Sequence, residues 1–276
     1  MRYVFVSDIH GCYDKLIAAL DKVHFNKDAD TIVSLGDAFD RGTQSWEVLE
    51  FLMSCPNRIL VWGNHDHRLY ELFLGKLSNH YDLSNGVLET MQSFCGNISL
   101  RSIGIAIQIF KTDDDKRDRC KLLFQYFNEC NYAVEWSDLV GIHGWIPYDE
   151  DYTATTYDKL GRPLTDIEYK YNSSWREASL HDWYSALWCH TEKCFKQGIF
   201  EPTKTMIVGH WHAWRLRSFA KHGQVVYDSV NNIDCGTFFY KDRLIAIDGC
   251  SNFSSGVVNT YVYETDEVPC LINPIK

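Results

Sequence analysis

Five short apolar runs in this sequence each end in a polar motif with a glycine, and this pattern constrains the fold more than any other feature. The runs have the length of buried strands, and they are Tyr3–Val6, Thr31–Leu35, Arg58–Trp62, Leu139–Ile142 and Thr205–Val208. Apolar residues at helical spacing follow the first three runs. The N-terminal third of the chain therefore predicts a β-α-β-α-β-α order.

Three further strand-like runs lie in the C-terminal part with no helices between them, at Val225–Tyr227, Leu244–Asp248 and Val257–Tyr263. Such a succession favours an antiparallel meander, so we expect the fold to mix parallel and antiparallel strands. Two stretches interrupt the pattern, at about residues 79–135 and 147–197. We expect both to be helical insertions beside one core, within a single domain that spans residues 1–276.

The composition excludes several classes of protein. With 27 Lys and Arg against 37 Asp and Glu, the net charge of −10 argues against a protein that coats nucleic acid, and we expect no nucleic-acid partner. No apolar run approaches the ~20 residues that cross a bilayer, and no secretory signal is readable, so we expect no membrane partner. The 10 cysteines are scattered without C-x-x-C spacing, which favours free thiols in a reducing cytoplasm. We expect a cytoplasmic protein whose oligomeric state the sequence leaves unknown.

Each of the five strand-like runs is followed by residues that can bind a metal. The motifs are Asp8-Ile9-His10-Gly11, Gly36-Asp37-Ala38-Phe39-Asp40-Arg41-Gly42, Gly63-Asn64-His65-Asp66, Gly141-Ile142-His143-Gly144 and Gly209-His210-Trp211-His212. Ligands in α/β sheets gather outside the carboxyl ends of strands, so these five motifs can meet in one crevice. A single histidine of this kind is more often a hydrogen-bonded core residue, but five such groups beside glycines predict a metal site.

This succession of motifs resembles the calcineurin-like metallophosphoesterase superfamily, whose pattern is D-x-H, G-D-x-x-D-R-G, G-N-H-[DE], a lone His, and G-H-x-H or G-H. Every block is present in order, from Asp8 to about His212. Arg41-Gly42 is most similar to the branch of serine/threonine protein phosphatases and symmetrical dinucleoside tetraphosphatases. The resemblance implies an α/β, four-layer metallophosphoesterase fold, with two mixed β-sheets packed as a sandwich and flanked by helices.

The resemblance also implies two divalent metal ions with a defined division of ligands: Asp8 and His10 for one metal, Asp37 as the bridge, and Asn64, His143 and His210 for the second. His212 is a possible further ligand, because the last histidine of G-H-x-H takes that role in many phosphodiesterase-like members. Oxygen and nitrogen donors without a thiolate favour Mn, Fe, Zn or Mg, and we take Mn as the first candidate.

The implied reaction is hydrolysis by a hydroxide that bridges the two cations and attacks phosphorus in line. By the same resemblance His65 protonates the leaving oxygen, Asp40 orients His65, and Arg41 binds phosphate oxygens. A structural salt bridge at a turn is the competing interpretation of Asp40 and Arg41. The branch usually supplies a second phosphate-binding arginine, for which Arg162 and Arg176 are candidates and Arg176 is our choice.

Two substrate classes compete for this expected dinuclear phosphoesterase. The first is phosphomonoesters, with phosphoserine and phosphothreonine proteins as targets. The alternative is symmetrical cleavage of diadenosine tetraphosphate, for which Trp211 and Trp214 are candidate base-stacking residues. A non-catalytic scaffold with this fold is a third hypothesis, disfavoured because every expected ligand and His65 are intact. For Asp66 and His67 we expect a capping role at a helix start.

Overall fold

The first sheet grows from the β-α repeats at the start of the chain. A computed structural model describes residues 1–96, 102–157, 163–224 and 233–274. The strand order of this sheet is β11-β1-β2-β3, with β11 antiparallel and the rest parallel: β1 (Arg2–Val6), β2 (Thr31–Ser34), β3 (Arg58–Leu60) and β11 (Tyr261–Glu264). The helices that follow the parallel strands are α1 (Tyr13–Lys22), α2 (Ser45–Ser54) and α3 (Asn64–Phe73). The expected alternation of strands and helices is therefore confirmed.

The second sheet has the order β12-β4-β5-β8-β10-β9. Its strands are β4 (Ala133–Glu135), β5 (Leu139–Ile142), β8 (Thr205–Val208), β9 (Phe238–Tyr240), β10 (Leu244–Ala246) and β12 (Cys270–Ile272). Strands β5, β8 and β10 are parallel, whereas β4, β9 and β12 run antiparallel to their neighbours. Both sheets are thus mixed, as expected.

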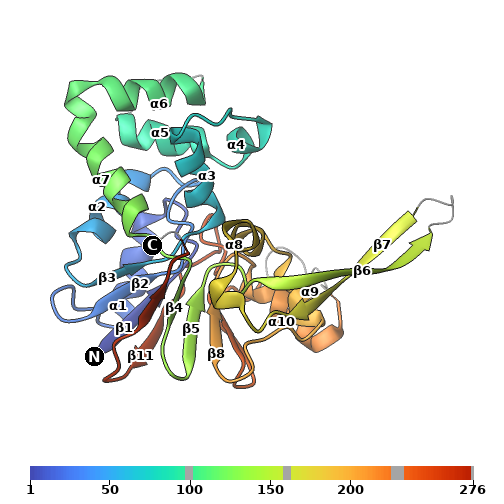
Figure 1. Ribbon diagram of the computed structural model, residues 1–276. Helices are drawn as coiled ribbons and strands as arrows, with labels where there is room; N and C mark the ends of the chain where they lie inside the picture. Colours follow the sequence, from blue (N-terminus) through green and yellow to red (C-terminus); the bar gives the residue numbers. More distant parts are fainter. Residues whose placement is uncertain (97–101, 158–162, 225–232, 275–276) are drawn as a thin grey trace.

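The two sheets pack face to face, because the strands carry apolar side chains on both faces and each face is covered by another layer. Tyr3 and Phe5 of β1 share a buried cluster with Leu139 and Ile207 of the second sheet. The intervening Val4 belongs to the other cluster, which includes the helices beside the first sheet. Layers of helix, sheet, sheet and helix result (Figure 1), which is the expected fold class.

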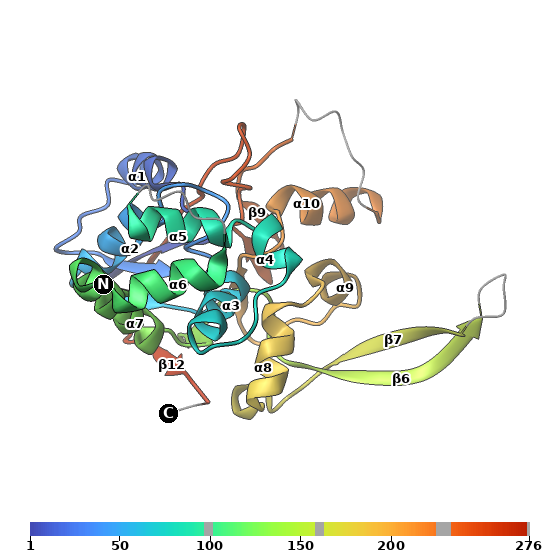
Figure 2. The ribbon, with the colours of Figure 1, turned by 90° about the horizontal axis from the view of Figure 1, so that it is seen from above.

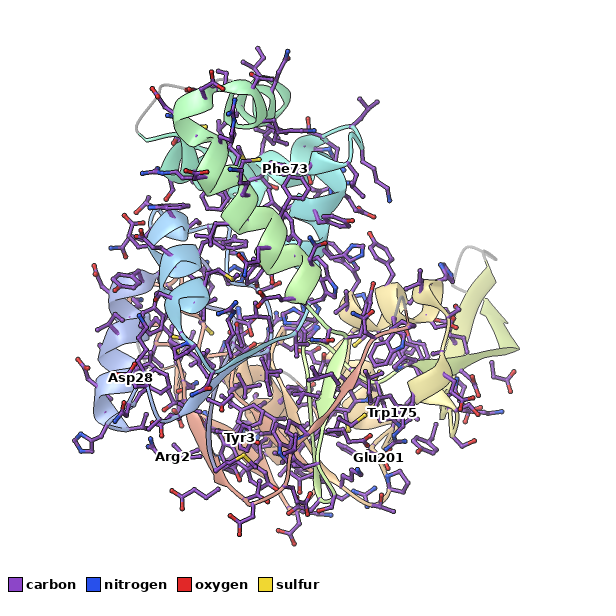
Figure 3. The ribbon with its side chains drawn as sticks, turned by 60° about the vertical axis from the view of Figure 1, so that its left-hand side comes forward. Arg2, Tyr3, Asp28, Phe73, Trp175 and Glu201 are labelled. Atoms are coloured by element: carbon purple, nitrogen blue, oxygen red, sulfur yellow. The ribbon has the colours of Figure 1, made fainter. Side chains whose placement is uncertain are left out.

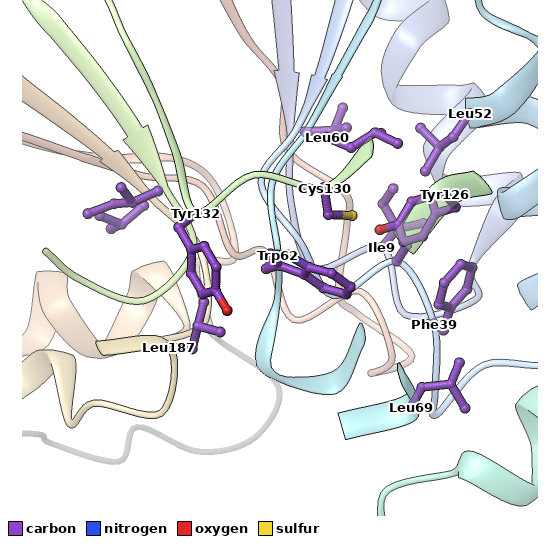
Figure 4. Packing of buried hydrophobic residues seen from close by; sticks show 14 of the residues in the cluster. Ile9, Phe39, Leu52, Leu60, Trp62, Leu69, Tyr126, Cys130, Tyr132 and Leu187 are labelled. Atoms are coloured by element: carbon purple, nitrogen blue, oxygen red, sulfur yellow. The ribbon is translucent and has the colours of Figure 1, made fainter. Parts of the chain in front are cut away.

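The first insertion is a helical unit that packs on α2. It contains α4 (His80–Ser84), α5 (Val87–Cys95), α6 (Ile103–Thr112), the short 3-10 helix η1 (Asp114–Lys116) and α7 (Arg117–Glu129). Phe39, from the loop after β2, lies 5.5 Å from the ring of Phe94 and 5.0 Å from that of Tyr126, between ring centroids. Figure 4 shows Phe39 and Tyr126 beside Ile9 of the first motif. The insertion is thus packed directly against the loops that carry the motifs.

The second insertion differs from the expected helical stretch. Its first half is an antiparallel hairpin of β6 (Tyr148–Tyr157) and β7 (Pro163–Tyr171), which projects far from the body (Figures 1 and 2). Its second half is helical, with η2 (Trp175–Glu177), α8 (Leu180–Leu187) and α9 (Thr191–Lys196). The first insertion ends before the expected residue 135, because residues 133–135 form β4 of the second sheet.

The expected C-terminal meander is wrong. Strand β10 pairs in parallel with β8, β11 joins the first sheet beside β1, and β12 pairs with β4. The remaining helix, α10 (Ala213–His222), follows the last motif. The run Val225–Tyr227 lies outside the described residues. Within the residues described, no helix has both the length and the apolar character to span a bilayer. The ten cysteines are free thiols.

Candidate metal centre

The five predicted motifs meet where the two sheets end. Strands β1, β2 and β3 point the same way in the first sheet, and β5 and β8 do so in the second. Their carboxyl ends carry the loops with His10, Asp37, His65, His143 and His210, which are brought together in space. The convergence predicted from the strand ends is therefore found.

Asp37 occupies the middle of this assembly. One group of possible ligand atoms, all within 4.8 Å of one another, joins Asp37 with His10 and His65. A second such group joins Asp37 with His143 and His210. A carboxylate that belongs to both groups has the two oxygens needed to face two cations at once.

Asn64 completes the second group. Its Oδ1 lies 2.9 Å from His143 Nε2 and 2.9 Å from His210 Nδ1, and His143 Nε2 lies 3.4 Å from Asp37 Oδ1. Asn64 is the first residue of α3, and its side chain is 2% exposed. One amide oxygen, two imidazole nitrogens and one carboxylate oxygen thus converge in a buried space, and this donor set fits a divalent cation.

Backbone carbonyls fix the imidazoles of the centre. His10 Nδ1 lies 2.9 Å from the Phe39 carbonyl and His143 Nδ1 lies 2.7 Å from the Leu35 carbonyl. An Nδ1–H that donates to a carbonyl leaves the Nε2 lone pair directed into the site, as in metal-binding histidines.

The electrostatics of the cluster also suit cations. Burial lowers the pKa of His10 and, together with neighbouring His143, lowers that of His210 to about 3, so both are neutral donors at pH 7. Burial also opposes protonation of His143, but the Asp37 carboxylate outweighs it and raises the pKa of His143 to about 10. Positive charge is therefore stabilised at this nitrogen, where a proton and a metal ion compete for one lone pair.

Asp8 lies beside the centre but outside both groups of ligand atoms. Its Oδ2 accepts a hydrogen bond from Ser7 Oγ (2.6 Å), and both its oxygens accept from the backbone N–H of His210, at 3.1 and 3.0 Å. Burial and the nearby Asp248 carboxylate raise the pKa of Asp8 well above its usual value. The Asp8 carboxylate thus joins the loops after β1 and β8.

His65 is held from both of its ring nitrogens. Its Nδ1 lies 2.9 Å from Asp40 Oδ2, and Arg41 Nη2 lies 3.1 Å from its Nε2. Arg41 Nη1 also lies 2.9 Å from His10 Nε2, so the guanidinium spans two imidazoles of the cluster. The expected proximity of His65, Asp40 and Arg41 is therefore found, in one network that faces the metal-binding groups.

Thr90 of α5 was not predicted from the sequence as part of this network. The backbone N–H of Asp40 donates to Thr90 Oγ1 over 2.8 Å, and the Thr90 hydroxyl donates to Asp40 Oδ1 over 2.9 Å. No local pattern marks this threonine, because the contact bridges the helical insertion and the loop after β2.

Asp66 has the structural role expected for it. Its carboxylate accepts hydrogen bonds from the backbone N–H groups of Asp37 (2.7 Å), Ala38 (3.1 Å) and Gly63 (3.2 Å). It therefore caps the start of α3 and fixes the loop that carries Asp37. Burial and the nearby Asp37 carboxylate raise the pKa of Asp66 to about 7.

The loops of the centre are held in a costly backbone conformation. In the described part of the chain nine residues other than glycine have positive φ, and six of them belong to the motifs: Asp8, His10, Asp37, Asp40, Arg41 and His210. Such a backbone costs energy that the surrounding structure must supply, and it is concentrated at functional sites. Gly63 cannot be replaced without movement, because a Cβ there would lie 2.1 Å from the backbone nitrogen of Asp37.

His212 is placed apart from the Asp37 groups. It forms a third group of possible ligand atoms with Asp248 and Cys250, and its Nε2 lies 4.0 Å from Asp248 Oδ2. Asp248 and Cys250 follow β10, the strand next to β8. The turn at Asp248 thus supports the last motif from the neighbouring strand.

The structure does not bring Arg176 to the centre, which corrects the expectation for this residue. Its Nε lies 3.1 and 2.9 Å from the two carboxylate oxygens of Glu135, and its guanidinium lies 4.2 Å from the Trp175 ring. Glu135 is paired with Val140 at the start of β5, whereas His143 follows the end of that strand. Figure 3 shows Trp175 beside Glu201 and far from Phe73 of α3. The other candidate, Arg162, lies outside the described residues.

The fold and the centre define a class of protein, the metal-dependent phosphoesterases built on a two-sheet sandwich. The family model of the calcineurin-like phosphoesterases matches residues 1–214. The chain belongs to this family, and it is a metal-dependent hydrolase with His and Asp groups positioned for a dinuclear centre.

The chain is similar in sequence to curated proteins and in fold to solved structures. The chain is 45% identical over 76 residues to the symmetrical bis(5'-nucleosyl)-tetraphosphatases of Salmonella paratyphi B and Salmonella typhimurium, covering 27% of this chain and 27% of each relative. The chain thus matches about a quarter of the length of these curated relatives. A crystal structure of a proposed diadenosine tetraphosphatase is 18% identical with a TM-score of 0.50, and the alignment covers 98% of this chain and 93% of that one. This similarity supports the fold.

Proposed function

We propose that the protein hydrolyses the phosphoanhydride bonds of dinucleoside polyphosphates, with diadenosine tetraphosphate as the model substrate. The observation that carries this proposal is a cavity of about 230 Å³ directly beside His210, lined by Trp188, His190, Trp211, His212 and Arg215. The Arg215 guanidinium lies 4.8 Å from the Trp211 ring, and the His190 ring lies 5.9 Å from it. Aromatic rings and a cation beside a phosphate-hydrolysing centre suit a nucleotide.

The residues that would hold two divalent cations are those that converge on Asp37: His10, Asn64, His143 and His210, with Asp8 beside them. Divalent cations at such a centre neutralise phosphoryl oxygens and lower the pKa of water, and Mn is our first candidate. His212 is the proposed additional ligand, although its present neighbours are Asp248 and Cys250.

The protein's own residues supply the remaining steps. Arg41 binds phosphate oxygens through the planar fork that now spans His10 and His65. When Arg41 leaves His65 Nε2 to bind the phosphate, this nitrogen can take up a proton and give it to the oxygen of the departing phosphate as the P–O bond breaks. Asp40 accepts from His65 Nδ1 and stabilises the protonated imidazole. The strongly acidic chain repels anions at a distance, so Arg41 and the bound cations must attract the substrate locally.

Hydrolysis of phosphoserine or phosphothreonine in proteins is the second candidate. The network of Asp40, Arg41 and His65 is compatible with it, because this network can bind a phosphoryl group and protonate a leaving oxygen irrespective of what the oxygen is attached to.

The deciding experiment compares the two substrates on one preparation. Metal-stripped protein is reloaded with Mn, and kcat/KM is measured for diadenosine tetraphosphate and for a phosphothreonine peptide, with His65→Asn as the inactive control. We expect a ratio far above one and two ADP molecules per substrate. A ratio far below one overturns the proposal in favour of a protein phosphatase.

A further inference from the structure

A second cavity, of about 310 Å³, opens at His65 and is not explained by the metal centre. It lies between the segment around α4 and α8, and its lining includes His65, Asp82, Asn85, Val87, Tyr184 and Trp188. Its volume is at the lower end of the range of ~300–1,000 Å³ that is typical of small-molecule sites. The shape of this cavity is thus set by both insertions.

The position of the cavity relates it to the departing half of the substrate. His65 and Asp40 form part of its wall, and His65 is the residue proposed to protonate the leaving oxygen. The half of the substrate that departs with this oxygen therefore extends from His65 into the cavity. The half that keeps the attacked phosphorus lies toward His210.

The charges in the wall are paired with one another. Arg68 binds Asp82 through two hydrogen bonds of 2.8 Å, and Asp40 binds His65 at 2.9 Å. Paired charges leave the cavity without a strong field for a further phosphate or an acidic peptide. An uncharged occupant is favoured.

The remaining lining suits a flat ring with polar edges. Tyr184 packs edge-on against His67 with centroids 5.3 Å apart, and Trp188, whose ring lies 6.3 Å from Tyr184, is 40% exposed. Among the residues that the structure describes, the side-chain amide of Asn85 makes no hydrogen bond. An exposed indole face and a free amide are the groups that recognise a nucleobase through stacking and edge hydrogen bonds.

Trp188 also lines the cavity beside His210, so the two cavities share this side chain. We propose that the cavity at His65 binds the nucleoside of the departing half of the substrate, with Trp188 and Tyr184 against the base and Asn85 at its edge. This inference rests on the proposed function, because it assigns the second nucleoside of a dinucleoside polyphosphate to the cavity at His65.

The test compares two substrates that differ only in that nucleoside, diadenosine tetraphosphate and adenosine 5'-tetraphosphate. For wild type, Trp188→Leu and Asn85→Ala, the kcat/KM ratio of the first substrate to the second is measured. We expect each variant to lower this ratio about tenfold, within the range that base stacking produces. Phe239→Leu is the matched control, since this exposed aromatic residue lies in β9, outside both cavities, and leaves the ratio as in wild type.

A binding measurement separates this inference from the proposed function. Adenosine is titrated calorimetrically into metal-free protein, and we expect saturable binding that Asn85→Ala and Trp188→Leu weaken about tenfold. Hydrolysis of diadenosine tetraphosphate with an unchanged ratio in both variants overturns the nucleoside site but keeps the proposed function. Hydrolysis of phosphothreonine peptides alone, with no adenosine binding, overturns both.

Discussion

Thr90 and Asp40 form a reciprocal pair, in which the backbone N–H of Asp40 donates to Thr90 Oγ1 and the Thr90 hydroxyl donates to Asp40 Oδ1. The other Asp40 oxygen binds His65 Nδ1 at 2.9 Å. A helix of the first insertion therefore determines the orientation of the proposed proton donor, although that insertion contributes none of the described metal-binding groups.

Replacing Thr90 tests this positioning role. Thr90→Val keeps the shape of the side chain but removes both hydrogen bonds, so we expect kcat to fall about tenfold, the equivalent of one such bond, with KM little changed. Steady-state kinetics with equal metal loading measures it. Thr90→Ser is the matched control and restores kcat; if Val and Ser variants behave alike, Thr90 does not act through Asp40.

His65→Asn removes the proposed proton donor. We expect kcat to fall by ~10²–10⁴ for an alkyl phosphate such as a phosphothreonine peptide, because an alkoxide leaves only when it is protonated. The loss should be much smaller for p-nitrophenyl phosphate, because p-nitrophenolate leaves without a proton. A loss of the same size for both leaving groups contradicts the role as general acid.

Asp37→Asn tests the residue shared by both groups of ligand atoms. The amide offers one weak oxygen where the carboxylate offers two, so we expect the variant to lose bound metal on dialysis. Elemental analysis of the dialysed protein measures the metal content. Asp14→Asn, on the exposed face of α1, is the control that keeps it; retention of two ions by the Asp37 variant rules out a bridging role.

Arg176→Met tests whether this arginine stabilises the fold or binds substrate. Because the guanidinium is held by Glu135, we expect a loss of about 1–3 kcal/mol in the free energy of unfolding and no change in KM. Denaturant unfolding and kinetics are measured on one preparation. A raised KM with unchanged stability restores the role of phosphate clamp that the sequence suggested.

The same pair predicts a pH dependence. Burial raises the pKa of Glu135, but hydrogen bonds from Arg176 and Lys204 outweigh it and hold the pKa below its ordinary value of 4.5. A lowered folded-state pKa contributes stability above the unfolded pKa, and this is lost as the pH falls through the folded value. The stability difference between wild type and Arg176→Met should therefore be widest above pH ~5 and narrow below it. A constant difference down to pH ~3 contradicts the ion pair as its source.

The strands and the motif residues were predictable because their signals are local. An apolar run followed by a glycine and a ligand-type side chain marks both a strand and its carboxyl end, so the convergence of His10, Asp37, His143 and His210 followed from strand direction alone. Likewise the carboxylate of Asp66 at a helix start indicated its capping role, which the structure confirms.

The parts that failed depend on contacts between distant segments. Arg176 has the right residue type for a phosphate site. Its position in the connection between two strands, however, does not tell whether its side chain faces the metal centre or Glu135. The sequence predicts helix for the β6–β7 hairpin because the helical spacing of the aromatic residues that follow it, from Trp175 to Trp188, dominates this stretch. The role of Thr90 depends on its hydrogen bonds with Asp40, and sequence periodicity does not reveal that these two residues are in contact.

The groups that converge on Asp37 are spread along the chain from His10 to His210. During synthesis strands β1, β2 and β3 and the helical insertion leave the ribosome before β8 exists, so the early ligands have no partners to complete their coordination. Contacts of such large sequence separation form late and slow the folding of a domain. A full set of ligands therefore exists only after β8 has brought His210 to the carboxyl ends of β1 and β2, and metal binding stabilises the docking of the two halves of the chain.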